Sequence, residues 1–171
     1  MSSKVIVIGG LPGTGKTSIA TMLSRSLGIP VYTKDLLEAA IVRCKLSTPE
    51  SLDGVGYELL KVLALEALAR NQGCILDCIA SSERVERFWG DLVGADLCYI
   101  ECLCTNSSLH RERLENRERN IPGWYEPTWE DVVAIGQGYR PWSETRLVLD
   151  ATNDIHDNLA RALAYVERNH R

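Results

Sequence analysis

The segment that most constrains this chain is Gly10–Thr17. It has the sequence Gly-Leu-Pro-Gly-Thr-Gly-Lys-Thr and matches the pattern Gly-x-x-x-x-Gly-Lys-Ser/Thr. Residues 4–9 before it are mostly β-branched and apolar, which predicts a buried strand. Residues 16–27 after it place apolar side chains at helical spacing. A strand, a glycine-rich turn and a helix form the context in which this pattern binds phosphate. Glycines let backbone N–H groups face an oxyanion, and the helix N-terminus adds its positive dipole end.

The pattern also assigns roles to individual residues. The Lys16 ammonium is expected to reach the β- and γ-phosphates of a nucleoside triphosphate, and the Thr17 hydroxyl is placed to ligate Mg²⁺. The alternative is a glycine-rich turn with an incidental lysine, which the flanking strand and helix disfavour. The predicted nucleotide-binding residues of this segment are Gly10, Leu11, Pro12, Gly13, Thr14, Gly15, Lys16, Thr17 and Ser18.

The rest of the chain alternates predicted strands and helices. Further strands are expected at 31–33, 74–78, 96–104 and 146–150, and helices at 35–45, 57–71, 81–92, from 105 or 106, at 128–137 and at 155–169. This alternation predicts an α/β fold, a three-layer αβα sandwich around a five-stranded parallel sheet. Residues 46–56 predict a mobile loop. We expect residues 1–171 to form one domain.

Three aspartates, Asp35, Asp77 and Asp150, lie at or just after the ends of predicted strands, and the carboxyl ends of parallel strands meet at one edge of a sheet. Asp77 is a candidate Mg²⁺ ligand, with a polar strand terminus as the alternative. Asp35 is a candidate catalytic residue that receives or orients an acceptor hydroxyl. It is also spaced from Glu38 as in a capping box, and the two roles are compatible. Asp150 is expected at the same edge.

Composition narrows the function further. The net charge of -4 argues against a sequence-independent nucleic-acid binder, and no apolar run approaches the length of a membrane span. The N-terminus lacks a basic and apolar leader, so a cytoplasmic location is expected. The six cysteines show no metal-binding spacing and are expected to be buried, reduced thiols. The three histidines, His110, His156 and His170, are expected on the surface.

The chain resembles P-loop kinases of the nucleoside-monophosphate-kinase type, and most closely the small kinases grouped with zeta-toxin-like, chloramphenicol-phosphotransferase-like and polynucleotide-kinase-like domains. The resemblance rests on Gly10–Thr17, on Thr33-Lys34-Asp35 and on the arginine-rich segment 111–119, which resembles a lid. It implies ATP and Mg²⁺ as cofactors, with Asp35 at the acceptor hydroxyl. It further implies a lid at about residues 105–127, with Arg113 and Arg117 closing on the phosphates, and a loop against the adenine at Thr152 and Asn153.

Two features of the lid region leave alternatives open. Arg113 and Arg117 are spaced i, i+4 and would share one helical face, whereas Arg111 and Arg119 would not. Such a face could clamp phosphates or could be a solvated, salt-bridged surface. The aromatic residues that follow could cover an acceptor or pin a loop onto the core, with Trp124 and Tyr125 the best ligand candidates.

Together these features predict an ATP- and Mg²⁺-dependent phosphotransferase acting on a small hydroxyl- or phosphate-bearing acceptor. The alternatives are a nucleotide-dependent ATPase or switch regulated by a protein partner, and a nucleic-acid 5′-end kinase. A GTPase is disfavoured because the chain has no Asn-Lys-x-Asp motif. An AAA+ machine is disfavoured because little chain follows the fifth predicted strand.

Overall fold

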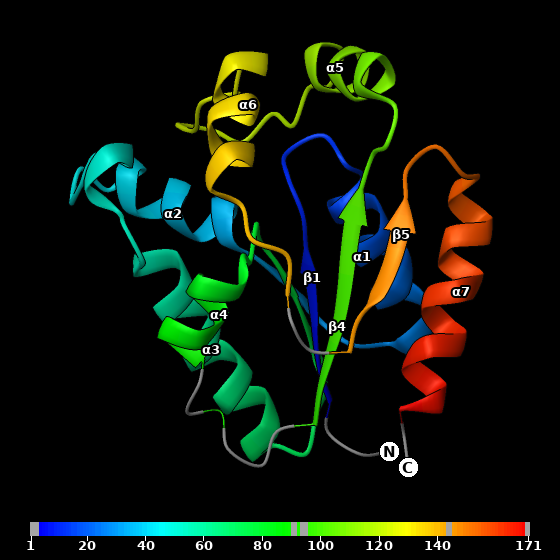
Figure 1. The fold of residues 1–171 in the computed structure, drawn as a ribbon. Coiled ribbons are helices and arrows are strands. Elements are labelled where there is room, and N and C mark those ends of the chain that lie inside the picture. Colours follow the sequence, from blue (N-terminus) through cyan, green and yellow to red (C-terminus); the bar gives the residue numbers. More distant parts are fainter. Residues whose placement is uncertain (1–3, 90–91, 93–95, 143–144, 170–171) are drawn as a thin grey trace.

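Five parallel strands form the centre of the computed structural model, which describes residues 4–89, 92, 96–142 and 145–169 (Figure 1). The strands are β1 (Lys4–Gly9), β2 (Val31–Thr33), β3 (Cys74–Asp77), β4 (Asp96–Leu103) and β5 (Leu147–Asp150). They pair in the order β2-β3-β1-β4-β5, with every adjacent pair parallel. The predicted five-stranded parallel sheet is therefore confirmed.

Seven α-helices connect and cover the strands within the described residues. They are α1 (Lys16–Leu27), α2 (Lys34–Arg43), α3 (Val55–Ala69), α4 (Ser82–Trp89), α5 (Ser107–Glu115), α6 (Trp129–Gly138) and α7 (Ile155–Arg168). The loop expected at 46–56 contains a single 3₁₀ turn, Pro49–Ser51, and α3 starts inside its last residues. None of the helices in the described parts of the chain is long and apolar enough to cross a membrane.

The sheet separates two hydrophobic cores, because successive side chains of a strand point to opposite faces. Val5 and Val7 of β1 pack in one core with α3 and α4, where Leu60 and Trp89 are buried. On the opposite face, Ile6 and Ile8 pack in the other core, which contains residues of α1 and α7. Helices thus cover both faces (Figure 1), which confirms the predicted αβα layering.

Glu101 is a buried charge within the apolar run that β4 forms after its first residue, Asp96. Glu101 is 5% exposed, and its carboxylate accepts hydrogen bonds from Arg146 Nε at 2.5 Å and from the Tyr139 hydroxyl at 2.8 Å. A buried carboxylate is tolerated only when it is paired in this way. Arg146 also donates to the Trp142 carbonyl at 2.7 Å. Tyr139 and Arg146 are therefore both tied to β4.

Helix caps agree with the sequence at α5 and α6 but not at α2. Thr128 and Asp131 form a capping box at α6, and Asn106 caps α5. Helix α2 starts one residue before Asp35, and no side chain caps it. The predicted capping box of Asp35 and Glu38 is wrong, because Glu38 instead forms an ion pair with Lys34 at 2.6 Å. Asp35 is consequently free of a capping role.

Candidate active site

The phosphate-loop candidate is held between β3 and β4 by its backbone. The Gly10 N–H donates to the Ile79 carbonyl at 3.0 Å. Gly10 has φ +132°, and a Cβ on it would lie 2.0 Å from the Cys102 carbonyl oxygen of β4. Only glycine fits that combination of backbone angle and close approach. The loop then turns through Gly13 and Gly15, which also have positive φ, and α1 begins at Lys16.

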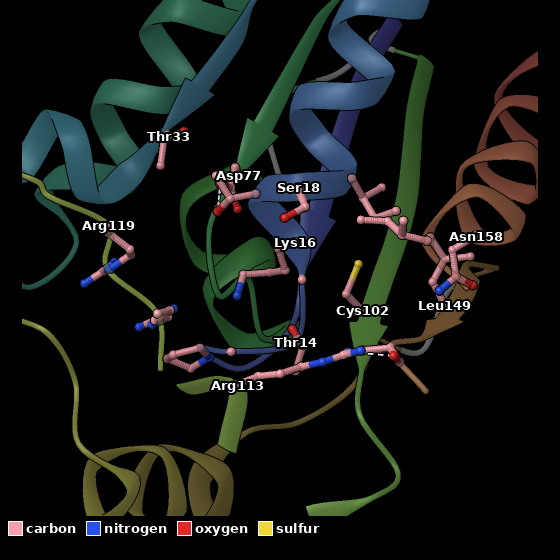
Figure 2. Close-up of a pocket in the computed structure, with 18 of the residues that line it drawn as sticks. Thr14, Lys16, Ser18, Thr33, Asp77, Cys102, Arg113, Arg119, Leu149 and Asn158 are labelled. Atoms are coloured by element: carbon pink, nitrogen blue, oxygen red, sulfur yellow. Dashed lines mark hydrogen bonds between the residues drawn. The ribbon is translucent and has the colours of Figure 1, made fainter. Parts of the chain in front are cut away.

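A cavity of about 810 Å³ opens over this loop at the carboxyl edge of the sheet. Figure 2 shows Lys16 and Asp77 in its middle, Arg119 on one side and Leu149 with Asn158 on the other. Of the predicted site residues, those that line the cavity are Pro12, Gly13, Thr14, Gly15, Lys16, Thr17, Ser18, Asp35, Asp77, Arg113, Arg117 and Asn153. Gly10 and Leu11 shape the loop without lining the cavity, and Thr152 does not line it either.

Lys16, Thr17 and Asp77 form a polar cluster at the base of the cavity. The Thr17 hydroxyl donates to Asp77 Oδ2 at 2.7 Å, and Lys16 Nζ donates to the Leu11 carbonyl at 2.8 Å. Burial raises the pKa of Asp77 and lowers the pKa of Lys16, although the opposite charge of each opposes the shift of the other. Both shifts have the same cause: the two charges lie in a poorly solvated site.

The same cluster fits a magnesium ion. A hydroxyl and a carboxylate side by side are oxygen ligands of the kind Mg²⁺ prefers, and Mg²⁺ commonly takes its remaining ligands from phosphate and water. The described residues contain no group of three or more His, Cys, Asp or Glu side chains that could hold a metal ion. Thr17 and Asp77 are therefore candidate ligands for an ion that a nucleotide brings with it.

Asp35 lies in the first turn of α2, and Arg119 binds it. Arg119 Nη1 donates to Asp35 Oδ2, while Arg119 Nε donates to Glu126 Oε2 at 2.9 Å and Nη2 donates to the Tyr125 carbonyl at 2.8 Å. Helical spacing predicts that Arg119 lies off the face shared by Arg113 and Arg117. Its contact with Asp35 spans 84 positions of the chain, and no local pattern signals such a pair.

The expectation that Arg113 and Arg117 share a helical face is wrong. Helix α5 ends at Glu115, so Arg117 lies in the segment beyond it. The two guanidiniums still line one cavity, but their neighbours differ: Arg113 contacts Ala151, and Arg117 lies near Glu126. Arg113 Nη1 donates to the Ala151 carbonyl at 2.6 Å, next to β5. Arg117 Nε lies 3.6 Å from Glu126 Oε2, and Nε and Nη2 of Arg117 are buried with no hydrogen-bond partner.

Asp150 does not join the cavity, which corrects the expectation that all three aspartates converge there. Its carboxylate accepts hydrogen bonds from the Thr105 hydroxyl at 2.6 Å and from the Thr152 N–H at 2.9 Å. Desolvation is the largest single effect and acts to raise the pKa of Asp150, but the hydrogen bonds from Thr105 and Thr152 together outweigh it and lower the pKa to about 2. Asp150 thus joins the loops that follow β4 and β5.

His110 is buried rather than on the surface, another correction. It is 6% exposed, its Nε2 lies 2.7 Å from the Pro12 carbonyl oxygen, and its ring meets Trp129 edge-on. Helices α5 and α6 are thereby attached to the phosphate loop. His156 is exposed as expected, and His170 lies outside the described residues.

The aromatic residues after α5 mostly pack, and Trp124 and Tyr125 contact each other without lining the cavity. Trp142 is buried, with its Nε1 donating to the Ala80 carbonyl and its ring against Tyr99. All six cysteines are free, and four are buried as expected, whereas Cys44 is exposed and Cys104 is partly exposed, which corrects the expectation for these two. Two of the six line the cavity, and burial raises the pKa of Cys102 to about 12, which keeps that thiol protonated.

The parallel sheet, with a glycine-rich loop between β1 and α1 and a lysine at the first position of that helix, defines the class of P-loop nucleotide-binding proteins. A family model described as an AAA domain matches residues 5–128, and the chain belongs to this family. No curated protein sequence matches it significantly. The match ends before β5, and only α7 follows β5 in the described chain.

Solved structures of kinases share this fold. A sugar kinase from Janibacter is 15% identical with a TM-score of 0.70, over 96% of this chain and 95% of its own. A gluconokinase from Sinorhizobium meliloti is 20% identical with a TM-score of 0.69, over 96% and 92%. The Mycobacterium tuberculosis APS kinase, in complex with AMPPNP and APS, is 17% identical with a TM-score of 0.67, over 97% and 98%.

Proposed function

We propose that the protein is an ATP- and Mg²⁺-dependent phosphotransferase that moves the γ-phosphate to a small acceptor. The observation that carries the proposal is a single cavity that continues from the phosphate loop to a carboxylate, Asp35, on a different element. A protein that only binds and hydrolyses a nucleotide does not require a carboxylate at the far end of the cavity, whereas phosphoryl transfer requires a positioned acceptor. The small-molecule kinases that share the fold support the same interpretation.

The proposed roles follow from position. The backbone N–H groups of the loop and Lys16 hold the β- and γ-phosphates. Thr17 and Asp77 hold Mg²⁺, which when bound neutralises charge on those phosphates. Arg113 and Asn153 lie on the side of Leu149, where we propose that the nucleoside binds with Thr152 nearby. Asp35 Oδ1 accepts the hydrogen bond of the acceptor hydroxyl, while Arg119 fixes Oδ2.

We also propose that residues 105–127 act as a lid. This segment supplies Arg113, Arg117 and Arg119 to the cavity, and its helix α5 touches the phosphate loop through His110. A cytoplasmic location suits an enzyme that consumes ATP and carries six free cysteines.

The experiment is ADP release from Mg·ATP in the presence of pooled acceptors. The pools are nucleosides, nucleoside monophosphates, sugars, hydroxylated antibiotics and short 5′-hydroxyl oligonucleotides. Lys16→Ala is expected to abolish transfer. Asp35→Ala is expected to leave nucleotide binding intact and to lower turnover by about 10²–10⁴-fold. Asp157→Ala, which removes an exposed aspartate from the first turn of another helix, is the matched control.

The outcomes separate the alternatives. A pool that accelerates wild type but not Asp35→Ala identifies a kinase and its acceptor class. Acceleration by oligonucleotides alone identifies a nucleic-acid 5′-end kinase. Hydrolysis in water that a protein partner stimulates, and that Asp35→Ala leaves unchanged, identifies a partner-regulated ATPase and contradicts the proposal.

A further inference from the structure

The side of the cavity near Asp35 contains a guanidinium whose hydrogen bonds are not satisfied. Arg117 lines the cavity, and its Nε and Nη2 are buried without an acceptor. The nearest carboxylate, Glu126, lies 3.6 Å from Nε, which is too far for a hydrogen bond. Buried donors are rarely left unpaired. A guanidinium with unpaired N–H groups in a cavity wall therefore indicates that a bound anion accepts hydrogen bonds from it.

Glu126 does not satisfy the donors of Arg117, because both of its carboxylate oxygens accept hydrogen bonds from Arg119. Glu126 Oε2 accepts from Arg119 Nε, and Oε1 accepts from the Arg119 backbone N–H at 3.2 Å. Each nitrogen of the Arg119 guanidinium already has an acceptor, since Nη1 bonds Asp35 and Nη2 bonds the Tyr125 carbonyl. Arg119 therefore positions Asp35, and Arg117 is the arginine of this pair with buried nitrogens, Nε and Nη2, that lack an acceptor.

Arg117 belongs to the side of the cavity that faces α2. Its segment is fastened there by Arg119 on Asp35 and by Arg43 of α2, whose Nη1 donates to the Pro122 carbonyl at 3.0 Å. Arg113, by contrast, is fastened next to β5. The nucleotide phosphates already have the loop N–H groups and Lys16 as donors. An anion for Arg117 is consequently expected from the molecule that occupies the Asp35 side.

We propose that the acceptor is a hydroxylated oxyanion, a small molecule with a carboxylate or phosphate group as well as the hydroxyl that is phosphorylated. The anionic group binds Arg117, and the hydroxyl donates to Asp35 Oδ1. In the transfer, the hydroxyl oxygen forms a bond to the γ-phosphorus as the bond to the β,γ-bridging oxygen breaks. ADP leaves with that electron pair, and the hydroxyl proton passes to Asp35 and then to water. This inference rests on the proposed phosphotransferase function and narrows its substrate class.

The test uses acceptor pairs that differ in the anion alone: glycerate with glycerol, gluconate with glucitol, glycerol 3-phosphate with glycerol, and nucleoside monophosphates with nucleosides. ADP release is measured for wild type, Arg117→Gln, Arg117→Lys and the control Arg111→Gln. Arg111 is an exposed residue of α5 paired with Glu115, outside the cavity. Melting of each variant without ligand verifies that it folds.

The proposal expects that the anionic member of a pair accelerates ADP release and that its neutral partner does not. Arg117→Gln should raise the KM for that anion about 10–100-fold, the effect of losing a charge-assisted contact, with the KM for ATP unchanged. Arg117→Lys should recover part of the loss. Whether the carboxylates or the phosphates respond distinguishes the two sources of the oxyanion.

Three results would overturn the proposal. Neutral acceptors that work as well as their anionic partners exclude it while leaving the kinase intact. An equal effect of Arg117→Gln on both members assigns Arg117 to the transferred phosphoryl group instead. If no acceptor is phosphorylated, the same anions are titrated into the complex of the protein with AMPPNP and their Kd is measured. An equal Kd for wild type and Arg117→Gln excludes Arg117 as the binding site of the anion. Failure of wild type to bind AMPPNP refutes the proposed function itself.

Discussion

Substituting Gly10 by alanine tests how the phosphate loop is built. Gly10 has φ +132°, and a Cβ added there would lie 2.0 Å from the Cys102 carbonyl oxygen. The backbone fixes the position of both atoms: the Cβ is attached directly to the Gly10 Cα, and Cys102 is inside β4, where it pairs with Leu149 of β5. No side-chain rotation relieves the contact. The strand or the loop has to move by more than 1 Å to restore an ordinary contact of about 3.5 Å.

The expected cost has two parts. The backbone angle is unfavourable for any residue with a Cβ, at about 1–3 kcal/mol. Forcing a methyl group into a packed region adds about 1–3 kcal/mol. The free energy of unfolding should therefore fall by about 2–6 kcal/mol, which for a chain of this length lowers Tm by roughly 5–20 °C. Gly28→Ala is the matched control, since Gly28 has φ +67° and nothing lies within 4 Å of its Cβ position. Its cost should be about 1–2 kcal/mol.

The assay is thermal and urea unfolding of both variants without nucleotide. A lower urea midpoint at unchanged slope identifies a loss of stability rather than a change in the unfolded state. The reasoning is refuted if Gly10→Ala costs no more than Gly28→Ala, because the loop and β4 would then not be in the close contact described here.

Three further predictions concern neighbouring parts of the molecule. His110→Ala, which removes the contact to the Pro12 carbonyl, should raise the Kd for ATP several-fold, whereas His156→Ala on the surface should not; nucleotide titration measures both. Glu101→Leu leaves two donors unpaired and should destabilise the fold by about 1–3 kcal/mol in urea unfolding, and a loss below 0.5 kcal/mol contradicts the pairing. Burial raises the pKa of Asp77, so a proton competes with Mg²⁺ as the pH falls: in a pH series, affinity for Mg²⁺ with ATP should rise with pH, and Asp77→Asn should flatten that rise.

The parts of this molecule that the sequence predicts are those that depend on neighbours in the chain. The phosphate loop, the strands beside it and the caps at Asn106 and Thr128 follow from patterns shorter than twelve residues. The parallel sheet follows from the alternation of these elements together with the handedness of their connections. The position of Asp77 in the cavity could be predicted because Asp77 ends β3, the strand next to β1, where the edge of the sheet meets the loop.

The parts that the sequence does not predict depend on distant contacts. Asp150 also ends a strand, but Thr105 from the neighbouring β4 loop binds its carboxylate outside the cavity. The i, i+4 spacing of Arg113 and Arg117 predicts a helix that continues to Arg117. It ends at Glu115, and the N–H of Arg119 pairs with the Glu126 side chain instead of with a helical carbonyl. That bond joins Arg119 to a residue seven positions further along the chain, a partner that helical spacing does not predict.

The same distant contacts connect the two poles of the proposed site. Residues 105–127 touch the phosphate loop at Pro12 through His110, and they touch α2 at Asp35 through Arg119 and at Arg43 through the Pro122 carbonyl. One segment is therefore in contact with the nucleotide pole and with the acceptor pole. Its three cavity-lining arginines differ in their partners: Arg113 holds the loop after β5, Arg119 holds Asp35, and Arg117 retains unpaired donors. Because Arg117 has buried nitrogens without an acceptor, our proposal assigns the anionic group of the acceptor to it, and that makes Arg117 the informative position to mutate.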